Sequence, residues 1–319
     1  MTFNIWLSGG SVEDGQYKIA KHIKIINPDI VALEEVESEE HVKNITAKIG
    51  PEWTYLIGTG SYPDTGIVTR HKFLNSGRAE THRDIKLTPN DQIYFGTTKT
   101  IIDSNSAIGT QILLDNGITV SFWALHLDYK SYGPYAAYNK LVTKKEQIMA
   151  GEDNGSKNCR SGQMHDLVTN KVFQAAINNS NNIPVFVCGD FNGPSHLDWN
   201  DKNKDAHGGW IIEWPATKQL MENAKMTDSF REIHPDIIAE PGYTWSTVQK
   251  FSSEGWNWTI PEPQDRIDFI FYRSSKLKPT NSFIYGGLEP LTPIPNHKNN
   301  DYPSDHYAVV TDFDVLNVN

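Results

Sequence analysis

The first fifty residues alternate between short apolar runs and longer segments whose apolar residues recur at helical spacing. The short runs are typical of buried strands, and the longer segments predict helices with one apolar face. The predicted elements are, in order, a strand at residues 3–6, a helix at 17–26, a strand at 30–33 and a helix at 38–49. Ser38 is the expected N-cap of the second helix, and Gly50-Pro51 ends that helix.

From about residue 53 to residue 126 the pattern predicts successive strands. The clearest strands are expected at residues 67–70, 92–95, 107–114 and 118–125. The Asp115-Asn-Gly117 segment lies between the last two and is a hairpin signal. Residues 129–182 return to helical spacing, most clearly over 163–178.

The second half of the chain contains three further strands, separated by a long loop-rich region. The strands are predicted at residues 183–188, 267–272 and 307–313, with aromatic-rich loops up to about residue 262. Helices cluster at the start and the middle, while the strands form two groups. We therefore expect an α+β fold in which two sheets pack face to face with helices outside. No linker or repeat divides the sequence, which predicts a single domain over residues 1–319.

Composition argues against several classes of protein. Of the 319 residues, 38% are hydrophobic, which is enough for a sizeable core, so intrinsic disorder is not expected. The net charge of -10 argues against a protein whose main task is to grip nucleic acid, because that affinity comes from basic side chains. No apolar run approaches the roughly 18 residues of a membrane span. Cys159 and Cys188 lack zinc-site spacing, and a disulfide between them stays open.

The residues from Thr2 to Trp6 already resemble a strand, with no leader in front of them. Two locations are consistent with this pattern: the cytoplasm, or a secreted or periplasmic location after removal of a signal segment. We favour the second as an expectation. The sequence leaves the oligomeric state open.

Polar residues stand at the ends of most of the predicted apolar strands. They are Asn4, Glu34, Glu35, His126, Asp190, Asn192, Asp268, Asp305 and His306. Burying each one separately would be costly, so convergence at one edge, around a cation or a phosphate, is the more favourable arrangement. Residues two apart on a strand point to the same face, which predicts that Asp190 and Asn192 reach one ligand together.

This set of residues, in this order, resembles the endonuclease/exonuclease/phosphatase superfamily, which includes DNase I-like nucleases, inositol polyphosphate phosphatases and neutral sphingomyelinases. The matching pieces are Phe3-Asn-Ile, Asp29-Ile-Val-Ala-Leu-Glu-Glu35, Leu125-His-Leu, Gly189-Asp-Phe-Asn192, Arg266-Ile-Asp268 and Ser304-Asp-His306. Each motif is weak alone, but together and in this order they are a strong signal. The resemblance implies a four-layer α/β/β/α sandwich, in which two mostly antiparallel sheets are flanked by helices.

The resemblance also implies a metal site. Glu35 is implied as the main ligand of a divalent cation, with Asn4 beside it. Asp305 is implied either to complete the metal shell or to orient its neighbour. Oxygen ligands with few carboxylates suit Mg²⁺, with Mn²⁺ or Ca²⁺ as alternatives.

Five further residues are implied to act on the phosphate ester itself. Asp190 would align and deprotonate the attacking water, and Asn192 would hydrogen-bond a phosphate oxygen. His306 would stabilise charge on the phosphoryl group, with its ring oriented by Asp268. His126 would be a second imidazole contact to phosphate.

Glu34 departs from the family pattern, in which Gln usually precedes the ligand Glu. Strand alternation predicts that only one residue of the pair faces the site, and the register favours Glu35. Glu34 is then expected to add negative charge nearby. Phe191 is expected to anchor the turn between Asp190 and Asn192 in the core.

Other polar and aromatic residues have ordinary structural explanations. Asp265 and Arg266 are expected to form a surface ion pair. Lys130 and Arg160 are expected to be solvated charges unless they contact an anionic substrate. The aromatic segments at residues 129–135 and 243–258 are expected to form either satellite cores or walls of a substrate cleft.

The sequence therefore predicts a metal-dependent phosphoesterase that uses in-line attack by water. We favour a small-molecule or lipid-headgroup phosphodiester or phosphomonoester as substrate, because the chain is acidic, lacks Lys/Arg-rich stripes and carries aromatic loops. A DNase I-like nuclease is the alternative, and nucleic acid is not the favoured partner. A non-catalytic binding protein is a rival from another class, but every implied catalytic position is filled.

Overall fold

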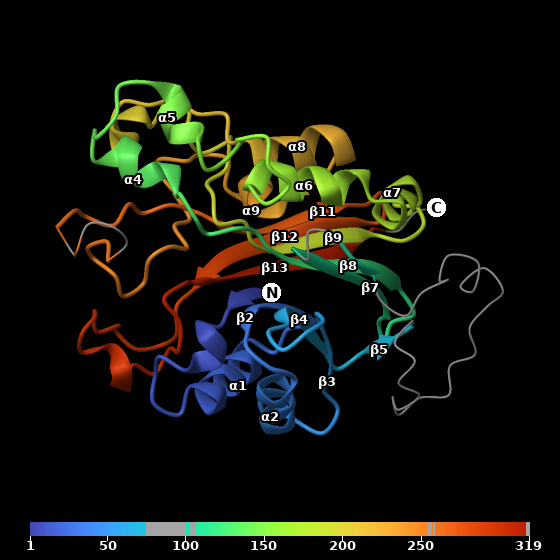
Figure 1. The fold of residues 1–319 in the computed structure, drawn as a ribbon. Helices are drawn as coiled ribbons and strands as arrows, with labels where there is room; N and C mark the ends of the chain where they lie inside the picture. The colour runs from blue at the N-terminus through green and yellow to red at the C-terminus, as the bar shows by residue number, and fades with distance from the viewer. Residues whose placement is uncertain (75–99, 103–105, 254–256, 258, 317–319) are drawn as a thin grey trace.

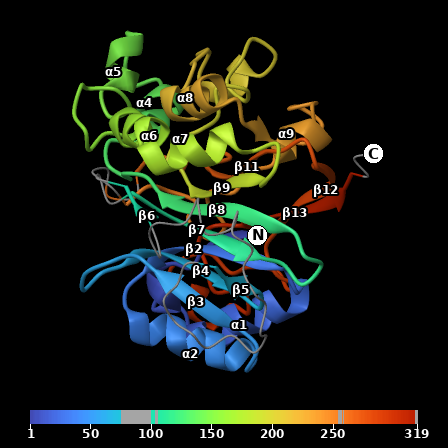
Figure 2. The same cartoon turned by 90° about the vertical axis from the view of Figure 1, so that its right-hand side faces the viewer.

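Two mixed β-sheets lie face to face at the centre of the structure, with helices on both outer faces (Figure 1). This computed structural model describes residues 1–74, 100–102, 106–253, 257 and 259–316. The layers follow the order helix, sheet, sheet, helix in both side views (Figure 2). The predicted four-layer sandwich is therefore confirmed.

The first sheet has six strands among the described residues, in the order β12-β13-β1-β2-β4-β3. The strands are β1 (Thr2–Asn4), β2 (Ile30–Val36), β3 (Thr54–Ile57), β4 (Asp64–Thr69), β12 (Leu277–Tyr285) and β13 (Ala308–Val315). β1 and β2 run parallel, and the other neighbours are antiparallel. Both ends of the described chain thus enter the same sheet.

The second sheet has seven strands in the described part of the chain, in the order β10-β11-β9-β8-β7-β5, with β6 paired to β7. The strands are β5 (Lys72–Phe73), β6 (Thr100–Ile101), β7 (Ala107–Leu113), β8 (Thr119–His126), β9 (Val185–Asp190), β10 (Thr227–Asp228) and β11 (Asp268–Arg273). Here β8 and β9 are the parallel pair, and the other pairs are antiparallel.

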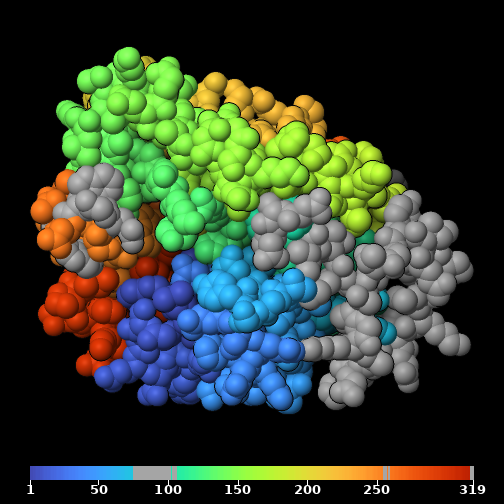
Figure 3. Space-filling model, in the orientation of Figure 1, coloured from blue at the N-terminus to red at the C-terminus, as the bar shows by residue number. Residues whose placement is uncertain are grey.

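Helices cover the outer face of each sheet. The helices of the first sheet are α1 (Gly15–Ile26) and α2 (Glu39–Ile49). Those on the side of the second sheet are α4 (Gly133–Tyr138), α5 (Lys145–Met149), α6 (Arg160–Thr169), α7 (Lys171–Asn178), α8 (Pro215–Ala224) and α9 (Ser229–Ile233). In the space-filling view the N-terminal residues, in blue, form the lower part of the molecule and the green residues of the middle of the chain form the upper part (Figure 3).

Strand β2 shows how the apolar runs build the core. Ile30 and Ala32 pack in the cluster between the two sheets, whereas Val31 and Leu33 pack in the cluster between the first sheet and its helices. A strand that is buried on both faces needs no polar side, and this explains its unbroken apolar sequence. A third cluster lies between the second sheet and helices α6 to α8.

The helical structure predicted over residues 163–178 is confirmed, but it is divided into two helices. Asn170 separates α6 from α7 with an extended ψ of 129°. Its side-chain oxygen accepts hydrogen bonds from the amides of Val172 at 2.9 Å and Phe173 at 3.2 Å. A short polar side chain that caps a new helix interrupts a helical pattern without changing its apolar spacing.

The sequence pattern also misses some elements. It does not predict β12, in which Pro279 lies on the edge strand of the first sheet next to a β-bulge, a position that tolerates proline. Helices α8 and α9 lie in a region expected to be loops. The strand expected at residues 92–95 lies outside the described residues. Cys159 and Cys188 are both free and buried, so they do not form the disulfide left open by the sequence.

The two parallel pairs bring four strand ends to one place in the sandwich. β1 and β2 end together in the first sheet, β8 and β9 end together in the second, and β1 contacts β9 across the interface. The polar residues that follow these strands are thereby collected at one edge. Within the described residues, no helix has the length and apolar character needed to cross a membrane.

We expect Asn170→Ala to lower the free energy of unfolding by about 1 kcal/mol, because α7 loses its N-cap. Urea denaturation followed by circular dichroism measures this change. Asn170→Ser, which keeps a capping oxygen, should retain most of the stability. Equal stability of the alanine variant and the wild type would contradict the capping role of Asn170.

Candidate active site

Asp190 is the residue on which the site converges. The parallel register of β8 and β9 places His126 opposite Asp190, and the antiparallel register of β11 places Asp268 opposite it on the other side. Asp190 is only 1% exposed. Its Oδ2 accepts the side-chain amide of Asn4 at 3.0 Å, and its Oδ1 accepts the backbone amide of Asn192 at 2.7 Å. Groups from both sheets thus hold one buried carboxylate.

Asn4 joins the two sheets at this point. Its Nδ2 donates to Glu35 Oε1 at 3.2 Å as well as to Asp190. Its Oδ1 accepts the amide of Trp6 at 3.0 Å, which fixes the orientation of the side chain. Glu35 Oε2 accepts the amide of Leu7 at 2.8 Å, so the Glu35 carboxylate is held from two directions.

A β-bulge separates the roles of Glu34 and Glu35. Glu35 has a φ of 63°, and the pairing of β2 with β4 shifts register between Glu34 and Val36. Glu35 lines the pocket, as the sequence predicts, although the bulge rather than simple strand alternation turns it there. Glu34 is fully buried, and its Oε1 accepts the hydroxyl of Thr2 at 3.0 Å.

The surroundings of Glu34 oppose the negative charge that the sequence suggested for it. Burial, followed by the nearby charges of Asp268 and Asp190, raises the pKa of Glu34 well above its usual value. This shift favours the neutral form of the Glu34 carboxyl group.

Two imidazoles flank Asp190, and an aspartate holds each imidazole by its other nitrogen. His306 Nδ1 lies 2.9 Å from Asp268 Oδ2, and its Nε2 lies 3.7 Å from Asp190 Oδ2. His126 has the same arrangement, with Nδ1 2.9 Å from Asp64 Oδ1 and Nε2 3.6 Å from Asp190 Oδ2. Two His–Asp pairs therefore point at one carboxylate, and in each pair the aspartate orients the imidazole as a carboxylate does in other hydrolases.

Asp64 is a site residue that the sequence analysis misses. It begins β4 with a φ of 62°, and it lines the pocket beside His126. Asp64 belongs to none of the quoted motifs. The signal that could have found it is its place next to an apolar strand, which is also the position of Asp268 at the start of β11.

The charges of these groups depend on one another. Although burial opposes it, the carboxylate of Asp64 raises the pKa of His126 to about 10. Burial also opposes protonation of His306, but Asp268 and Asp190 outweigh it and raise that pKa well above its usual value. Burial, and then the charge of Asp268, raise the pKa of Asp190 to about 6. These shifts favour the cationic form of both imidazoles, and the pKa of Asp190 lies below neutral pH, which favours its ionised form.

Asn192 reaches the site from a turn and not from the strand. β9 ends at Asp190, and Asn192 has a φ of 48°, so the explanation by strand alternation is wrong. The two residues still converge, because Asn192 Nδ2 lies 2.9 Å from both His126 Nε2 and the carbonyl oxygen of Leu127. Phe191 is fully buried in the core and anchors the turn, as expected.

Glu35 and Asp305 offer oxygen atoms for a divalent cation. Both residues line the pocket. Asp305 is 5% exposed, and its Oδ1 has no hydrogen-bond partner within the described chain. Burial raises the pKa of Asp305 to about 8. A buried carboxyl oxygen without a partner next to a second carboxylate fits a hard cation, so the residues present suit the implied metal.

A second group of side chains could also bind a metal ion: Asp190, Asp268 and His306 each place one possible ligand atom within 4.8 Å of the other two. Within this group, His306 Nδ1 is already engaged with Asp268 Oδ2 at 2.9 Å. Asp268 also does not line the pocket, whereas Glu35 and Asp305 do. The Glu35 and Asp305 pair is therefore the better metal position.

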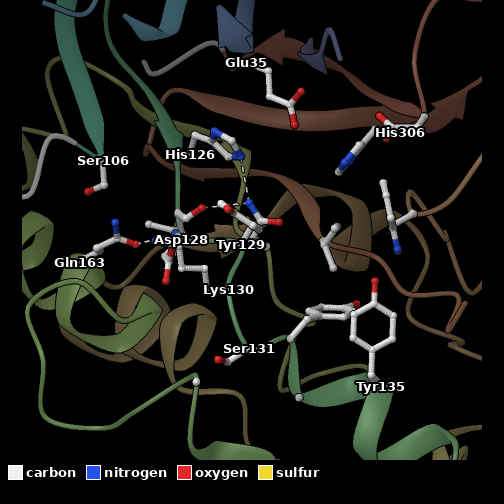
Figure 4. A pocket seen from close by; sticks show the side chains of 18 of the residues that line it. Glu35, Ser106, His126, Asp128, Tyr129, Lys130, Ser131, Tyr135, Gln163 and His306 are labelled. Atoms are coloured by element: carbon white, nitrogen blue, oxygen red, sulfur yellow. Dashed lines mark hydrogen bonds between the residues drawn. The ribbon is translucent and has the colours of Figure 1, made fainter. Parts of the chain in front are cut away.

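The site opens into a pocket of about 1310 Å³ (Figure 4). Glu35, His126 and His306 lie along one part of its wall. The segment of residues 129–135 supplies another part, so the expected role in a substrate cleft is consistent with its position. Trp245 also lines the pocket, with its ring centre 4.8 Å from that of His306.

Arg160 is not the solvated charge that the sequence suggested. It is fully buried and paired with Glu152. Its guanidinium group also donates to the backbone carbonyls of Asp128, Lys130 and Ser131. Arg160 therefore fixes the loop that follows β8, which lines the pocket.

The expected surface ion pair between Asp265 and Arg266 is also wrong, because both residues are buried. Asp265 accepts hydrogen bonds from the indole N–H of Trp199 at 2.8 Å and the hydroxyl of Tyr132 at 2.9 Å. Arg266 instead pairs with Asp198 at 2.8 Å.

Residues 1–306 match the model of the Endonuclease/Exonuclease/phosphatase family. The chain belongs to this family. The enzymes of the family are phosphoric-ester hydrolases that depend on a divalent metal, and membership places this chain in the same class of phosphodiesterases, phosphatases and nucleases.

Two relatives illustrate the range of the family. The chain is 47% identical over 316 residues to an uncharacterized protein of Caenorhabditis elegans, covering 99% of this chain and 91% of that protein. It is 32% identical over 136 residues to the CCR4-Not complex 3'-5'-exoribonuclease subunit Ccr4 of Coccidioides immitis. The second match covers 42% of this chain but only 16% of that relative.

Solved structures agree on the fold. D. rerio TDP2 in complex with a single strand DNA product is 18% identical, with a TM-score of 0.57, and the match covers 98% of this chain and 97% of that one. The human Nocturnin catalytic domain is 19% identical, with a TM-score of 0.53, covering 98% and 93%. These likenesses confirm the DNase I-like fold.

We expect Asp64→Asn to lower kcat/KM by at least about tenfold, because His126 loses the carboxylate that keeps it charged and oriented. Steady-state kinetics on any ester that the wild type hydrolyses measures the loss. Asp29→Asn is the matched control, since Asp29 Oδ1 lies 2.9 Å from His71 Nε2 away from the pocket residues. Full activity of the Asp64 variant would show that His126 does not need its partner.

Proposed function

We propose that this chain is a Mg²⁺-dependent phosphodiesterase that hydrolyses a compact phosphate ester, from a small molecule or a lipid headgroup, by in-line attack of water. One observation carries the proposal: the buried carboxylate of Asp190 lies between the imidazoles of His126 and His306, next to an open pocket. Each imidazole is in turn held by the carboxylate of a second aspartate. The Asp190 carboxylate can accept a proton from water while the two cations stabilise charge on the phosphoryl group.

Each residue has one task in the proposed reaction. Asp190 aligns and deprotonates the attacking water, and its pKa of about 6 keeps it ionised yet basic at neutral pH. His126 and His306 hold the phosphoryl oxygens as cations. Asn192, fixed beside His126, donates a hydrogen bond to a phosphate oxygen.

The metal position is assigned to Glu35 and Asp305. Carboxylate oxygens suit Mg²⁺, and they also accept Mn²⁺ or Ca²⁺. A bound divalent cation supplies charge neutralisation at a phosphate oxygen. Asn4 keeps Glu35 in position through its hydrogen bond of 3.2 Å.

The charges around the pocket support a compact substrate. Glu35, Asp64 and Asp128 line it, whereas Lys130 is, beside the imidazoles of His126 and His306, the only basic side chain among the lining residues that the structure describes. A polynucleotide brings further phosphates, which need basic side chains along their path. A single ester group without further phosphates avoids repulsion from these carboxylates.

A nuclease is the second candidate, and the relatives favour it. Ccr4 of Coccidioides immitis is named a 3'-5'-exoribonuclease, and D. rerio TDP2 is seen with a single strand DNA product. A nuclease activity would fall steeply with salt, whereas hydrolysis of a compact ester would change little.

The test is hydrolysis of a substrate panel with Mg²⁺ or with EDTA. The panel contains plasmid DNA, RNA, sphingomyelin, inositol phosphates and simple phosphate mono- and diesters. We expect Mg²⁺-dependent cleavage of a compact ester, and a loss of at least about a hundredfold in Asp190→Ala and His306→Ala. Cleavage of nucleic acid alone would select the second candidate, and hydrolysis of no compound would overturn the proposal.

We expect Glu35→Gln to raise the Mg²⁺ concentration for half-maximal activity by at least about tenfold, because the site loses a ligand charge. Calorimetric titration with Mg²⁺ provides a readout independent of turnover. Glu37→Gln is the control, since Glu37 is near in sequence but does not line the pocket. An unchanged Mg²⁺ requirement in Glu35→Gln would place the metal elsewhere.

A further inference from the structure

Three aromatic side chains form a wall of the pocket beside His306. Tyr132 and Tyr135 come from the start of α4, and their rings meet edge to face with centres 5.3 Å apart. Trp245 comes from a loop far along the chain and lies against His306. All three aromatic residues line the pocket, and Tyr135 lies across it from Glu35 (Figure 4).

Two buried carboxylates hold this wall from behind. Glu262 Oε1 accepts both the indole N–H of Trp245 and the hydroxyl of Tyr135, each at 2.7 Å. Asp265 Oδ2 accepts the hydroxyl of Tyr132 at 2.9 Å. Glu262 is 4% exposed and Asp265 is 2% exposed. The polar hydrogen of each of these rings is therefore committed to the protein, which leaves their carbon surface for a ligand.

The wall is also coupled to the imidazole through the backbone. Trp245 forms isolated β-bridges with both Asp265 and His306. The amide of Trp245 donates to the carbonyl of Asp265 at 3.0 Å, and the amide of Tyr307 donates to the carbonyl of Thr244 at 2.8 Å. A group that leaves the phosphate on the His306 side would meet Trp245 first.

We infer that Tyr132, Tyr135 and Trp245 form an aromatic subsite for the organic group of the phosphate ester, and that Glu262 is the positioning residue of this subsite. The inference rests on the proposed function, because it assumes that a phosphoryl group is held by the imidazoles. Because the polar hydrogens of these three rings are already bonded within the protein, the rings can bind a ligand only by stacking and apolar contact. The preferred organic group is therefore flat, aromatic and free of additional phosphate.

Glu262 has a position that links two distant segments. Tyr135 and Trp245 share its Oε1 atom, so removal of this one acceptor breaks a hydrogen bond of both rings at once. Without this acceptor, the indole N–H of Trp245 and the hydroxyl of Tyr135 would each turn towards another hydrogen-bond partner, because a buried unpaired donor is costly. The aromatic wall would then change its shape. The loss should therefore affect ligands with an organic group more than ligands without one.

The test is calorimetric titration of the Mg²⁺-loaded protein with three phosphonates that cannot be hydrolysed. These are methylphosphonate, cyclohexylmethylphosphonate and benzylphosphonate. For the wild type we expect benzylphosphonate to bind about tenfold more tightly than methylphosphonate, with the cyclohexyl compound between them. Glu262→Ala should bring the benzyl-to-methyl ratio close to one, whereas Glu262→Gln, which keeps an acceptor oxygen, should retain most of the ratio.

Glu232→Ala is the matched control. Glu232 also accepts a tyrosine hydroxyl, that of Tyr272 at 2.7 Å, but it does not line the pocket, so the binding ratio should stay at the wild-type value. If Glu262→Ala does not fold, Trp245→Leu removes one ring of the wall and should lower the ratio as well.

The outcomes separate this inference from the proposed function. Equal binding of methyl- and benzylphosphonate by the wild type would overturn the subsite and leave the phosphodiesterase proposal intact. Equal binding of the cyclohexyl and benzyl compounds would overturn the preference for an aromatic group. Failure of all three to bind in the presence of Mg²⁺ would overturn both proposals.

Discussion

The carboxylate of Asp190 is almost fully buried, at 1% exposure, and the groups around it make a charge in that position tolerable. A buried charge is costly unless neighbouring groups hydrogen-bond to it or carry the opposite charge. The side chain of Asn4, the amide of Asn192 and two imidazoles supply both kinds of partner. The carboxylates around each imidazole, with its paired aspartate first among them, raise its pKa.

The architecture makes this concentration of charge feasible. Each sheet contains one parallel pair of strands, and the ends of both pairs lie at the same edge of the sandwich. The first sheet supplies Asn4 and Glu35, and the second supplies His126, Asp190 and Asp268. Neither sheet could form the site alone, because Asn4 hydrogen-bonds to the carboxylate of Glu35 in the first sheet and to that of Asp190 in the second.

The buried strands and the main site residues could be predicted from the sequence. Unbroken apolar runs identify strands such as β2 and β9. The polar residues that follow several of these runs, in the order of the family motifs, indicate the site. The sequence did not assign three other residues to the site, namely Asp64, Glu262 and Arg160. Each acts through a partner far along the chain, such as His126 for Asp64, and local spacing carries no information about such pairs.

The sequence by itself therefore determined the strands and the helices outside them, because apolar periodicity is a local property. The order of its motifs indicated the family and the residue types that meet at the edge of the sandwich. Only the tertiary structure decided the electrostatics of the site. A pKa depends on burial and on charges brought close from distant segments. The pKa values of Glu34 and His126 are therefore raised for reasons that no local pattern contains. The same holds for the aromatic wall, whose rings share a carboxylate only after the chain has folded.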